Sequence, residues 1–502
     1  MKFNKTVLVV FLSAFLLTGL FYKQYFGLNI LLFDVLFLLW LIGSKQLSWK
    51  NKNVIIASSG FFLTALFTVI THSTFSYLMH FLAITVFIGV LNYTKVRSLF
   101  SAGIISLVAL FQSQGIFAQH LSGTRMKGKT IGGLLWKTRI FIIPVFIIFL
   151  FVGLYSFSNP VFGDMINNLG LGIQNTFNYI FEGLDFFLLL TFLLCLFISI
   201  YLFTRTANKS LIQQDINAVE VLQRDKKKGA RWFKPMGLKN EHKAGIFLLL
   251  TLNALLLILN VLDVYWVWFN FAWEGQTLKQ FVHEGTYLLI FSILISIAVV
   301  LYFFRGNLNF YSKNQFLKYL GYIWIVQNAI LVISVAIRNF RYIEYFALAY
   351  KRIGVILFLI LVLYGLYSVA RKIQYKKSAF YLFKSNALVL YGVLVLASFV
   401  NWDSFIAKYN FAHSDTAFLH LDYMASLSDK TLPLLDKPLS ELTQINQVQF
   451  EKYRYQFTMQ PDHYKRTIEN RKMDFKKTWE SKNVLSWNLP EYLAYKKLFQ
   501  NE

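Results

Sequence analysis

The chain has 502 residues, of which 56% are hydrophobic and only 15% are charged. Soluble domains carry about 25% charged residues, and here the apolar residues come in long blocks. These two features exclude a soluble enzyme, a disordered chain, a collagen and a coiled coil. The net charge of +25 is typical of basic loops that set membrane orientation and contact anionic lipid head groups. Composition therefore predicts an all-α, polytopic membrane protein that binds no nucleic acid.

Eleven apolar segments approach the length of about 20 residues that a helix needs to cross the hydrocarbon. A twelfth stretch, 98–118, is interrupted by polar residues at 112–114, and we expect it to lie in the interface or to be re-entrant. The first segment follows Lys2 and Lys5 without a convincing cleavage site, which indicates a retained anchor. The eleven segments are 6–22, 26–43, 54–71, 74–92, 140–157, 184–204, 244–269, 286–304, 317–337, 353–370 and 385–402.

The basic residues indicate how these spans are oriented. With the N-terminus in the cytoplasm, the inner segments hold 30 Lys and Arg residues and the outer loops hold 6. The positive-inside rule favours this arrangement, whereas letting 98–118 cross, with the N-terminus outside, gives 24 inside against 12 outside. The prediction is an inner-membrane protein with a cytoplasmic N-terminus and a periplasmic tail.

Four regions follow from this pattern. Residues 1–204 and 244–402 form two transmembrane bundles, and the loop 205–243 between them holds ten Lys and Arg residues, which suits anionic lipid at the inner leaflet. The tail, 403–502, carries 14 basic and 13 acidic residues with apolar residues near helical spacing. We expect the tail to be a small helical extramembrane domain that binds a protein partner.

Several stretches of the second half carry a resemblance to a known family. They are Gly237-Leu-Lys-Asn-Glu241, Leu262-Asp-Val-Tyr-Trp-Val-Trp-Phe269, Phe281-Val-His-Glu-Gly-Thr-Tyr287, Phe304-Arg-Gly-Asn307, Tyr342-Ile-Glu-Tyr-Phe-Ala-Leu-Ala-Tyr-Lys-Arg-Ile353, Asn401-Trp-Asp-Ser-Phe-Ile-Ala-Lys-Tyr-Asn410 and Leu421-Asp-Tyr-Met-Ala-Ser-Leu-Ser-Asp-Lys-Thr-Leu-Pro433. Together they resemble the bacterial integral membrane proteins grouped as domain of unknown function 4173, the sister of group 4153. The resemblance covers about 237–435, and His283-Glu-Gly favours the first group. It implies a bacterial inner-membrane location and brings no catalytic residues.

The segment 244–269 carries a polar stripe formed by Asn253, Asn260 and Asp263. At 100° per residue these side chains fall within about 80° of one another. Polar groups in lipid are costly, so the stripe should face other helices or a water cavity. It is either a polar lining for a substrate or proton, or a row of interhelical hydrogen bonds.

Asp34 lies in the middle of 26–43. An ionised and unpaired carboxylate at this depth costs several kcal/mol. It is therefore neutral, paired, or facing a cavity, with His80 or Gln327–Asn328 as possible partners. A proton relay and a structural pair are the two interpretations.

The predicted outer face holds a second group of candidates. His283 and Glu284 could act as acid and base, or as interfacial anchors. Arg338, Arg341 and Glu344 follow at i, i+3 and i+6, so Arg341 and Glu344 can pair on a helix. With Lys351 and Arg352, the arginines could bind a phosphate or carboxylate, or form structural ion pairs.

Two motifs are not expected to hold a ligand. Gly123-Thr-Arg-Met-Lys-Gly-Lys-Thr130 fits the phosphate-loop pattern, but the flanking spans leave no room for the nucleotide-binding domain that the motif requires. In the tail, His413 and Asp415 are echoed seven residues later by His420 and Asp422; a metal is conceivable there, but an ordinary junction helix explains the spacing. We expect no metal and no cofactor, and the lone Cys195 excludes an intramolecular disulfide.

The absence of a nucleophile–base motif or a metal triad favours a non-enzymatic function. We expect a membrane scaffold, sensor or assembly factor with an external tail. One alternative is a transporter of a small solute or lipid-linked intermediate, lined by Asp34 and the polar stripe. The other is a membrane-embedded enzyme that acts on lipid or glycan.

Overall fold

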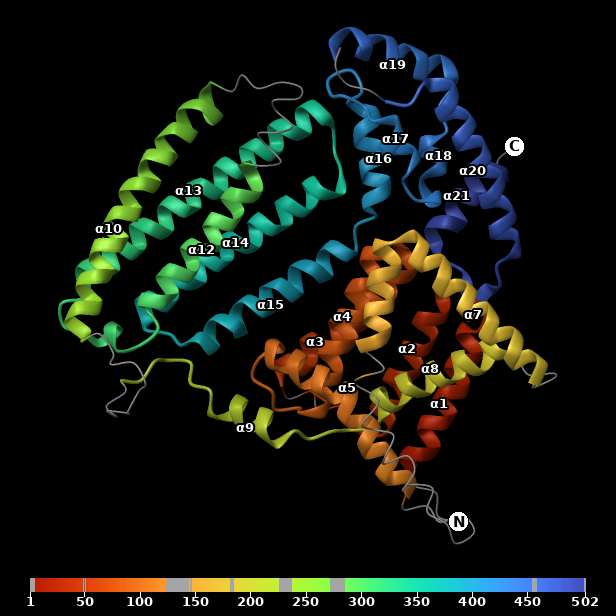
Figure 1. Cartoon of the computed structure of the whole chain (residues 1–502), viewed down its shortest axis with the longest axis horizontal. Coiled ribbons are helices and arrows are strands. Elements are labelled where there is room, and N and C mark those ends of the chain that lie inside the picture. The colour runs from red at the N-terminus through yellow and green to blue at the C-terminus, as the bar shows by residue number, and fades with distance from the viewer. Residues whose placement is uncertain are drawn as a thin grey trace. The chain divides into compact units, whose positions relative to one another are not determined.

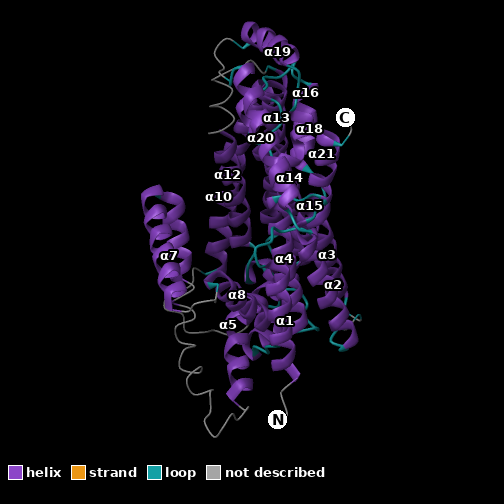
Figure 2. Cartoon of the chain, turned by 90° about the vertical axis from the view of Figure 1, so that its right-hand side faces the viewer, coloured by secondary structure: helices purple, strands orange, loops and turns teal. Residues whose placement is uncertain are grey.

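The fold is known from a computed structural model that describes residues 5–47, 49, 51–122, 144, 147–180, 185–224, 237–270, 285–453 and 458–500. Over these residues the secondary structure is helical (Figure 2), apart from an isolated antiparallel bridge between Val221 and Lys377. The chain divides into two compact units. Unit 1 comprises Met1–Ile216 and Lys482–Asn488, and unit 2 comprises Asn217–Ser481 and Leu489–Glu502.

Unit 1 is a bundle of apolar helices (Figure 1). An apolar helix over Ile147–Ser158 precedes α7, and the short helix η5, Val484–Ser486, comes from the tail. The other helices are α1 (Lys5–Phe21), α2 (Leu28–Gly43), α3 (Lys52–Ile70), α4 (Thr74–Asn92), α5 (Leu99–Ser122), α7 (Pro160–Ile180), α8 (Phe186–Phe203) and α9 (Lys209–Asn217).

Two helix pairs organise unit 1. α1 and α8 run antiparallel, because Lys23 pairs with Asp185 at 3.0 Å while Ser199 donates to Ser13 at 3.1 Å. α4 and α5 approach so closely that a Cβ on Gly89 would lie 1.8 Å from the carbonyl oxygen of Ala102. Glycine is therefore required at position 89 for these two backbones to pack together.

Aromatic rings fill the core between these helices. Phe37 contacts Phe61, Phe87 and Phe203 with ring centroids 5.0 to 6.3 Å apart. All three contacts are edge-to-face, the arrangement that aromatic quadrupoles favour.

α5 begins and ends at the same end of unit 1. It follows a loop whose Thr94 and Val96 carbonyls accept hydrogen bonds from Asn51, at the start of α3. His120, in its last turn, lines a cavity together with Lys5 and Arg205, at the start of α1 and just after α8. A helix of 24 residues is about 36 Å long, so α5 must run across the bundle near this end.

The α1–α2 loop lies at the opposite end of α1 from Lys5 and binds the tail segment of unit 1. The amide of Leu28 donates to the Trp487 carbonyl at 2.9 Å, and the amide of Tyr25 donates to Ser486 Oγ at 3.0 Å. Residues 482–488 thus complete a unit that otherwise consists of the first 216 residues.

Unit 2 contains a second apolar bundle and the helices of the tail (Figure 1). The bundle helices are α10 (Leu238–Asp263), the π-helix η1 (Val264–Phe269), α12 (Thr286–Phe303), η3 (Asn307–Phe310), α13 (Gln315–Phe346), α14 (Tyr350–Tyr375) and α15 (Ala379–Ser398). The tail helices are α16 (Trp402–Ala412), α17 (Leu421–Ala425), η4 (Asp429–Thr431), α18 (Leu432–Leu435), α19 (Leu439–Lys452), α20 (Pro461–Ser481) and α21 (Leu489–Phe499).

Unit 2 has two main hydrophobic cores. One joins α10, α12, α13 and α14 through residues such as Leu249, Ile293 and Leu331. The other joins α16 to α21 around Met424, Tyr464 and Ile468, and it includes Ile343 and Ile353 from α13 and α14. The tail helices α16 to α21 therefore share one core with the α13–α14 hairpin.

Within the described ranges, eight helices are long and apolar enough to cross a membrane, which confirms the polytopic all-α prediction. They include α5, so hydropathy alone does not separate 98–118 from the other spans. Four shorter apolar helices coincide with predicted spans: Lys5–Phe21, Leu28–Gly43, Ile147–Ser158 and Tyr287–Phe303. The region 158–183, expected to be a loop, contains α7.

Candidate functional site

The polar stripe of α10 is buried against α13. Asn253 Nδ2 donates to the Leu320 carbonyl at 3.1 Å, and Gln327 Nε2 donates to Asn253 Oδ1 at 2.8 Å. Seven residues further along α10, Asn260 Nδ2 donates to the Gln327 carbonyl at 3.1 Å. Each asparagine contacts the carbonyl 67 residues later in the chain, so α10 and α13 run parallel.

The stripe ends in a buried ion pair. Arg338 Nη2 lies 2.5 Å from Asp263 Oδ1, and the two side chains are 6% and 7% exposed. Trp268 Nε1 donates to Ser334 Oγ one turn away. Asn253, Asn260 and Asp263 thus all contact α13, the arrangement expected of interhelical hydrogen bonding.

Two of the other outer-face candidates that the structure describes, Arg341 and Arg352, have contacts of their own. Arg341 pairs with Glu344 at 3.1 Å, as the i, i+3 spacing predicts, and this pair is exposed. The Arg352 guanidinium lies 4.4 Å from the centre of the Tyr342 ring and donates to the carbonyls of Phe346 and Ala347. His283 and Glu284 lie outside the described residues, as does the 123–130 motif.

Asp34 is paired with His80, one of its predicted partners. His80 Nε2 lies 3.1 Å from Asp34 Oδ2, and both side chains are buried. The other ring nitrogen, Nδ1, lies 3.3 Å from Thr64 Oγ1, and the imidazole stacks on Phe61. α2, α3 and α4 therefore assemble an Asp–His–Thr chain in the apolar interior of unit 1.

The junction between the second bundle and the tail carries a further polar cluster. The side-chain amide of Asn410 accepts a hydrogen bond from the Leu348 amide at 2.8 Å and donates to the Leu348 carbonyl at 3.0 Å. This clamp holds the tight turn between α13 and α14, where Ala347 has a φ of 59°. Non-glycine residues rarely adopt such a φ, so the tail helix α16 stabilises a strained turn of the bundle.

Beside this clamp lies a second buried ion pair. Lys430 Nζ is 3.0 Å from Asp403 Oδ2, with side-chain exposures of 1% and 9%. The Tyr350 side chain also hydrogen-bonds to Asp403, and the Tyr423 hydroxyl accepts a hydrogen bond from the Tyr350 amide at 3.2 Å. α14, α16 and η4 thus meet at Asp403.

Burial and charge change the ionisation of this junction. Burial alone would raise the pKa of Asp403, but attraction to Lys430 and the surrounding hydrogen bonds outweigh it and lower that pKa. Burial lowers the pKa of Lys430, and Asp403 and Glu491 offset only part of the effect. Burial raises the pKa of Tyr423. Such perturbed groups mark either a functional site or a structural ion-pair network.

Sequence reasoning did not select Asn410, Asp403 or Lys430 as site residues. The signal was available: these residues lie in two of the family-like stretches, 401–410 and 421–433, and they contact a third, 342–353. Three separated stretches that carry the resemblance therefore meet in one junction.

The His/Asp echo of the tail is dispersed. His413 stacks on Tyr409, whereas His420 lies between Phe346 and Phe418. Asp422 accepts hydrogen bonds from Thr458 and the Met459 amide. No group of three or more His, Cys, Asp or Glu side chains suited to a metal occurs in the part of the chain that the structure describes.

The long apolar helices, with polar residues paired between them, define a polytopic α-helical membrane protein. Residues 6–437 match the sequence model of the family described as Domain of unknown function (DUF4153), and the chain belongs to that family. The match is therefore to group 4153, the sister of the group that the sequence favoured, and it includes the first half of the chain. No curated protein and no solved structure matches the chain.

Proposed function

We propose that this protein is a bacterial inner-membrane scaffold or sensor component that presents its helical tail at the outer surface. The observation that carries the proposal is the junction: Asn410 and the Asp403–Lys430 pair join the tail to the α13–α14 hairpin through buried polar contacts. Through these contacts, a movement of the α13–α14 hairpin displaces the tail helices, and a change in the tail displaces the hairpin. The polar stripe of α10 supports this function because its hydrogen bonds hold helices together.

Three observations support an orientation with a cytoplasmic N-terminus and a periplasmic tail. Basic residues concentrate on the predicted inner side, 30 against 6. Both ends of α5 lie at one end of unit 1, so this helix adds no crossing. Tail residues 482–488 bind the α1–α2 loop, at the other end of α1 from Lys5. An odd number of crossings follows.

Labelling of single cysteines tests this orientation. In a Cys195→Ser background, we expect Lys477→Cys on α20 to react with a membrane-impermeant maleimide from the outer side. Lys52→Cys, at the start of α3, should react only after the inner side is opened; both positions are exposed in the structure. Reaction of both cysteines from the same side would contradict the proposed topology.

The scaffold function is tested by complementation of a strain that lacks the protein. Asn410→Ala removes both hydrogen bonds to Leu348, so we expect it to loosen the tail and to abolish complementation, while Thr443→Ala on the exposed face of α19 serves as a matched control. Asp34→Asn, which alters the buried carboxylate without touching the tail, should complement. Full complementation by Asn410→Ala, with the tail shown by proteolysis to be loosened, would refute the scaffold.

Proton-coupled transport is the second candidate, and the Asp34–His80–Thr64 chain favours it. Ionisable residues inside a membrane bundle are costly and are often proton relays. If the protein is a transporter, Asp34→Asn abolishes both complementation and proton-coupled uptake, whereas Asn410→Ala reduces them only as far as it destabilises the protein. The same set of variants therefore distinguishes the two functions.

A further inference from the structure

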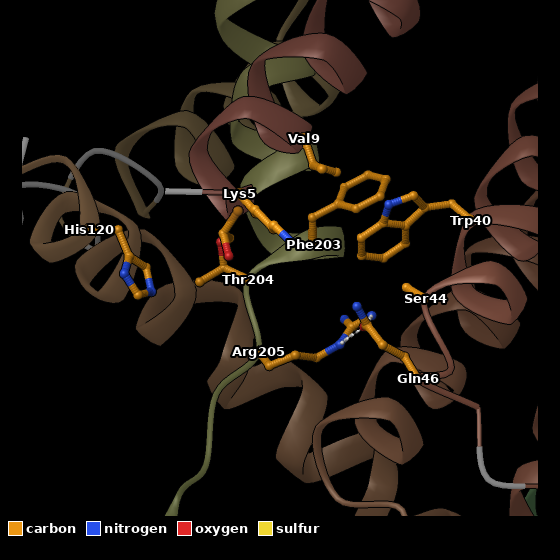
Figure 3. A pocket seen from close by; sticks show the side chains of 10 residues that line it. Lys5, Val9, Trp40, Ser44, Gln46, His120, Phe203, Thr204 and Arg205 are labelled. Carbon is orange, nitrogen blue, oxygen red and sulfur yellow. Dashed lines mark hydrogen bonds between the residues drawn. The ribbon is translucent and has the colours of Figure 1, made fainter. Parts of the chain in front are cut away.

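A cavity of about 390 Å³ opens at the end of unit 1 where α1 begins and α2, α5 and α8 end. Figure 3 shows Arg205 and Gln46 on one side, the Trp40 and Phe203 rings beside them, and Lys5 and His120 across the cavity. The remaining lining residues are Thr6, Val9, Ser44 and Thr204.

Arg205 is the central cation of this cavity. Its Nε and Nη2 donate to Gln46 Oε1 at 3.1 and 3.0 Å, and its Nη1 donates to the Leu202 carbonyl at 2.7 Å. A guanidinium has five N–H donors, so two remain beyond these three bonds. Among the described residues, the side chain is thus held in place by neutral oxygens, with donors left for a ligand.

The cavity has positive charge and no acidic lining residue. Its lining, as far as the chain is described, combines Lys5, Arg205 and His120 with no Asp or Glu. Burial lowers the pKa of Arg205 to about 10, and no acidic side chain in the described part of the chain offsets this effect, so the group is still cationic at neutral pH. A half-buried cation without a counter-ion is unfavourable, and an anion within the cavity would relieve that cost.

The walls of the cavity indicate the kind of anion. Trp40 and Phe203 pack edge-to-face with ring centroids 4.8 Å apart, and they join the cations to the apolar bundle. Tryptophan beside basic residues at the ends of membrane helices is typical of the head-group region. Basic pockets between helices on the inner side are suited to phosphate head groups of anionic lipids.

We infer that this cavity binds the phosphate group of an anionic phospholipid. Arg205 and Lys5 contact the phosphate oxygens through charge-assisted hydrogen bonds, and the Trp40 and Phe203 rings contact the glycerol and the first methylenes. This cavity is a single defined site, distinct from the general attraction of the basic loops to the membrane surface.

The test measures binding by the purified full chain, freed of lipid and placed in nanodiscs of phosphatidylcholine with increasing phosphatidylglycerol. We expect phosphatidylglycerol to raise the melting temperature and to remain bound in native mass spectra. Gln46→Glu places a carboxylate on Arg205 and should weaken binding at least roughly tenfold, since a hydrogen bond to a charged group contributes about 1.5–3 kcal/mol. Lys5→Gln, at an exposed position, should weaken it several-fold without affecting the fold.

Lys52→Gln is the matched control, because it removes an exposed positive charge from the same end of unit 1 but lies outside the cavity. It should bind like the wild type. Unchanged binding by both Gln46→Glu and Lys5→Gln, or equal stabilisation by phosphatidylcholine alone, would overturn the inference. If Gln46→Glu does not fold, Lys5→Gln decides. Stabilisation by glycerol 3-phosphate, with no further effect of phosphatidylglycerol, would assign the site to a soluble phosphate ester and overturn the lipid assignment.

Discussion

The Asp403–Lys430 pair allows a quantitative test of the junction. Lys430→Met removes the cation 3.0 Å from Asp403 and leaves a buried carboxylate without that counter-ion. Breaking a buried pair in this way costs about 3–5 kcal/mol. Changing both partners, as in Asp403→Leu with Lys430→Met, also removes the cost of burying two charges, so we expect the double variant to lie within about 1–2 kcal/mol of the wild type.

The free energy of unfolding of the tail can be followed by pulse proteolysis in urea on the full chain in detergent. Lys437→Met is the matched control: its partner Glu441 lies 2.8 Å away, but both side chains are partly exposed, so its loss should cost less than about 1 kcal/mol. The reasoning is refuted if Lys430→Met is as mild as Lys437→Met. It is also refuted if the double variant is as unstable as Lys430→Met alone.

Three further predictions concern packing and pH. Gly89→Ala should destabilise unit 1 by several kcal/mol or prevent accumulation, because its Cβ would overlap the Ala102 carbonyl; Gly103→Ala, with open space around its Cβ, should be neutral or stabilising by up to about 1 kcal/mol. Thermal unfolding in detergent compares the two, and equal behaviour would contradict the α4–α5 contact. Asn253→Ala should lower the free energy of unfolding by about 1–3 kcal/mol, because it leaves buried hydrogen-bond partners on α13 unsatisfied. Thr251→Ala, on the exposed face of α10, should lower it by less than about 0.5 kcal/mol. Thermal unfolding in detergent measures both variants. The folded tail lowers the pKa values of Asp403 and Asp436 below the ordinary 3.8. The stability that these carboxylates contribute is therefore present above that pH and is lost as the pH falls through their folded pKa values. The urea midpoint of tail unfolding should drop on acidification below about pH 4, and it should drop less steeply in Asp403→Asn.

Hydropathy located the spans because a helix that crosses lipid must be apolar over about 20 residues. It did not locate the helix ends where polar residues continue a helix. α13 runs from Gln315 to Phe346, beyond the predicted 317–337, because Arg338 is neutralised by Asp263 and Arg341 by Glu344. These pairings also explain how a basic cluster is accommodated on the predicted outer side. α7 was missed because an amphipathic helix lacks the continuous apolar run that marks a span.

The polar sites differed in how well they could be predicted. The spacing of Asn253, Asn260 and Asp263 placed them on one face, since helical periodicity fixes direction along a single element. The partners on α13, the Asn410 clamp and the Asp403–Lys430 pair depend on contacts between residues 27 to 75 positions apart in the sequence, which periodicity does not encode. His80 was predicted as a partner of Asp34 because few ionisable groups lie within the apolar segments.

The two asparagine contacts between α10 and α13 are seven residues apart on both helices, so the same contacts fit two alignments of these helices. The neighbouring ion pair selects one of the two alignments. If α10 slid by seven residues, Asn253 would meet the Gln327 carbonyl, to which Asn260 now donates, so the asparagine-to-carbonyl contacts alone would barely distinguish the two alignments. In the shifted alignment the Gln327–Asn253 and Trp268–Ser334 hydrogen bonds would be lost. Asp263 would lie opposite Tyr345 and Arg338 opposite Leu256, so both charges would also lose their partner in an apolar setting. A pair of opposite charges that adds little net stability can thus select one helix alignment, and a sliding motion of α10 along α13 would first have to break it.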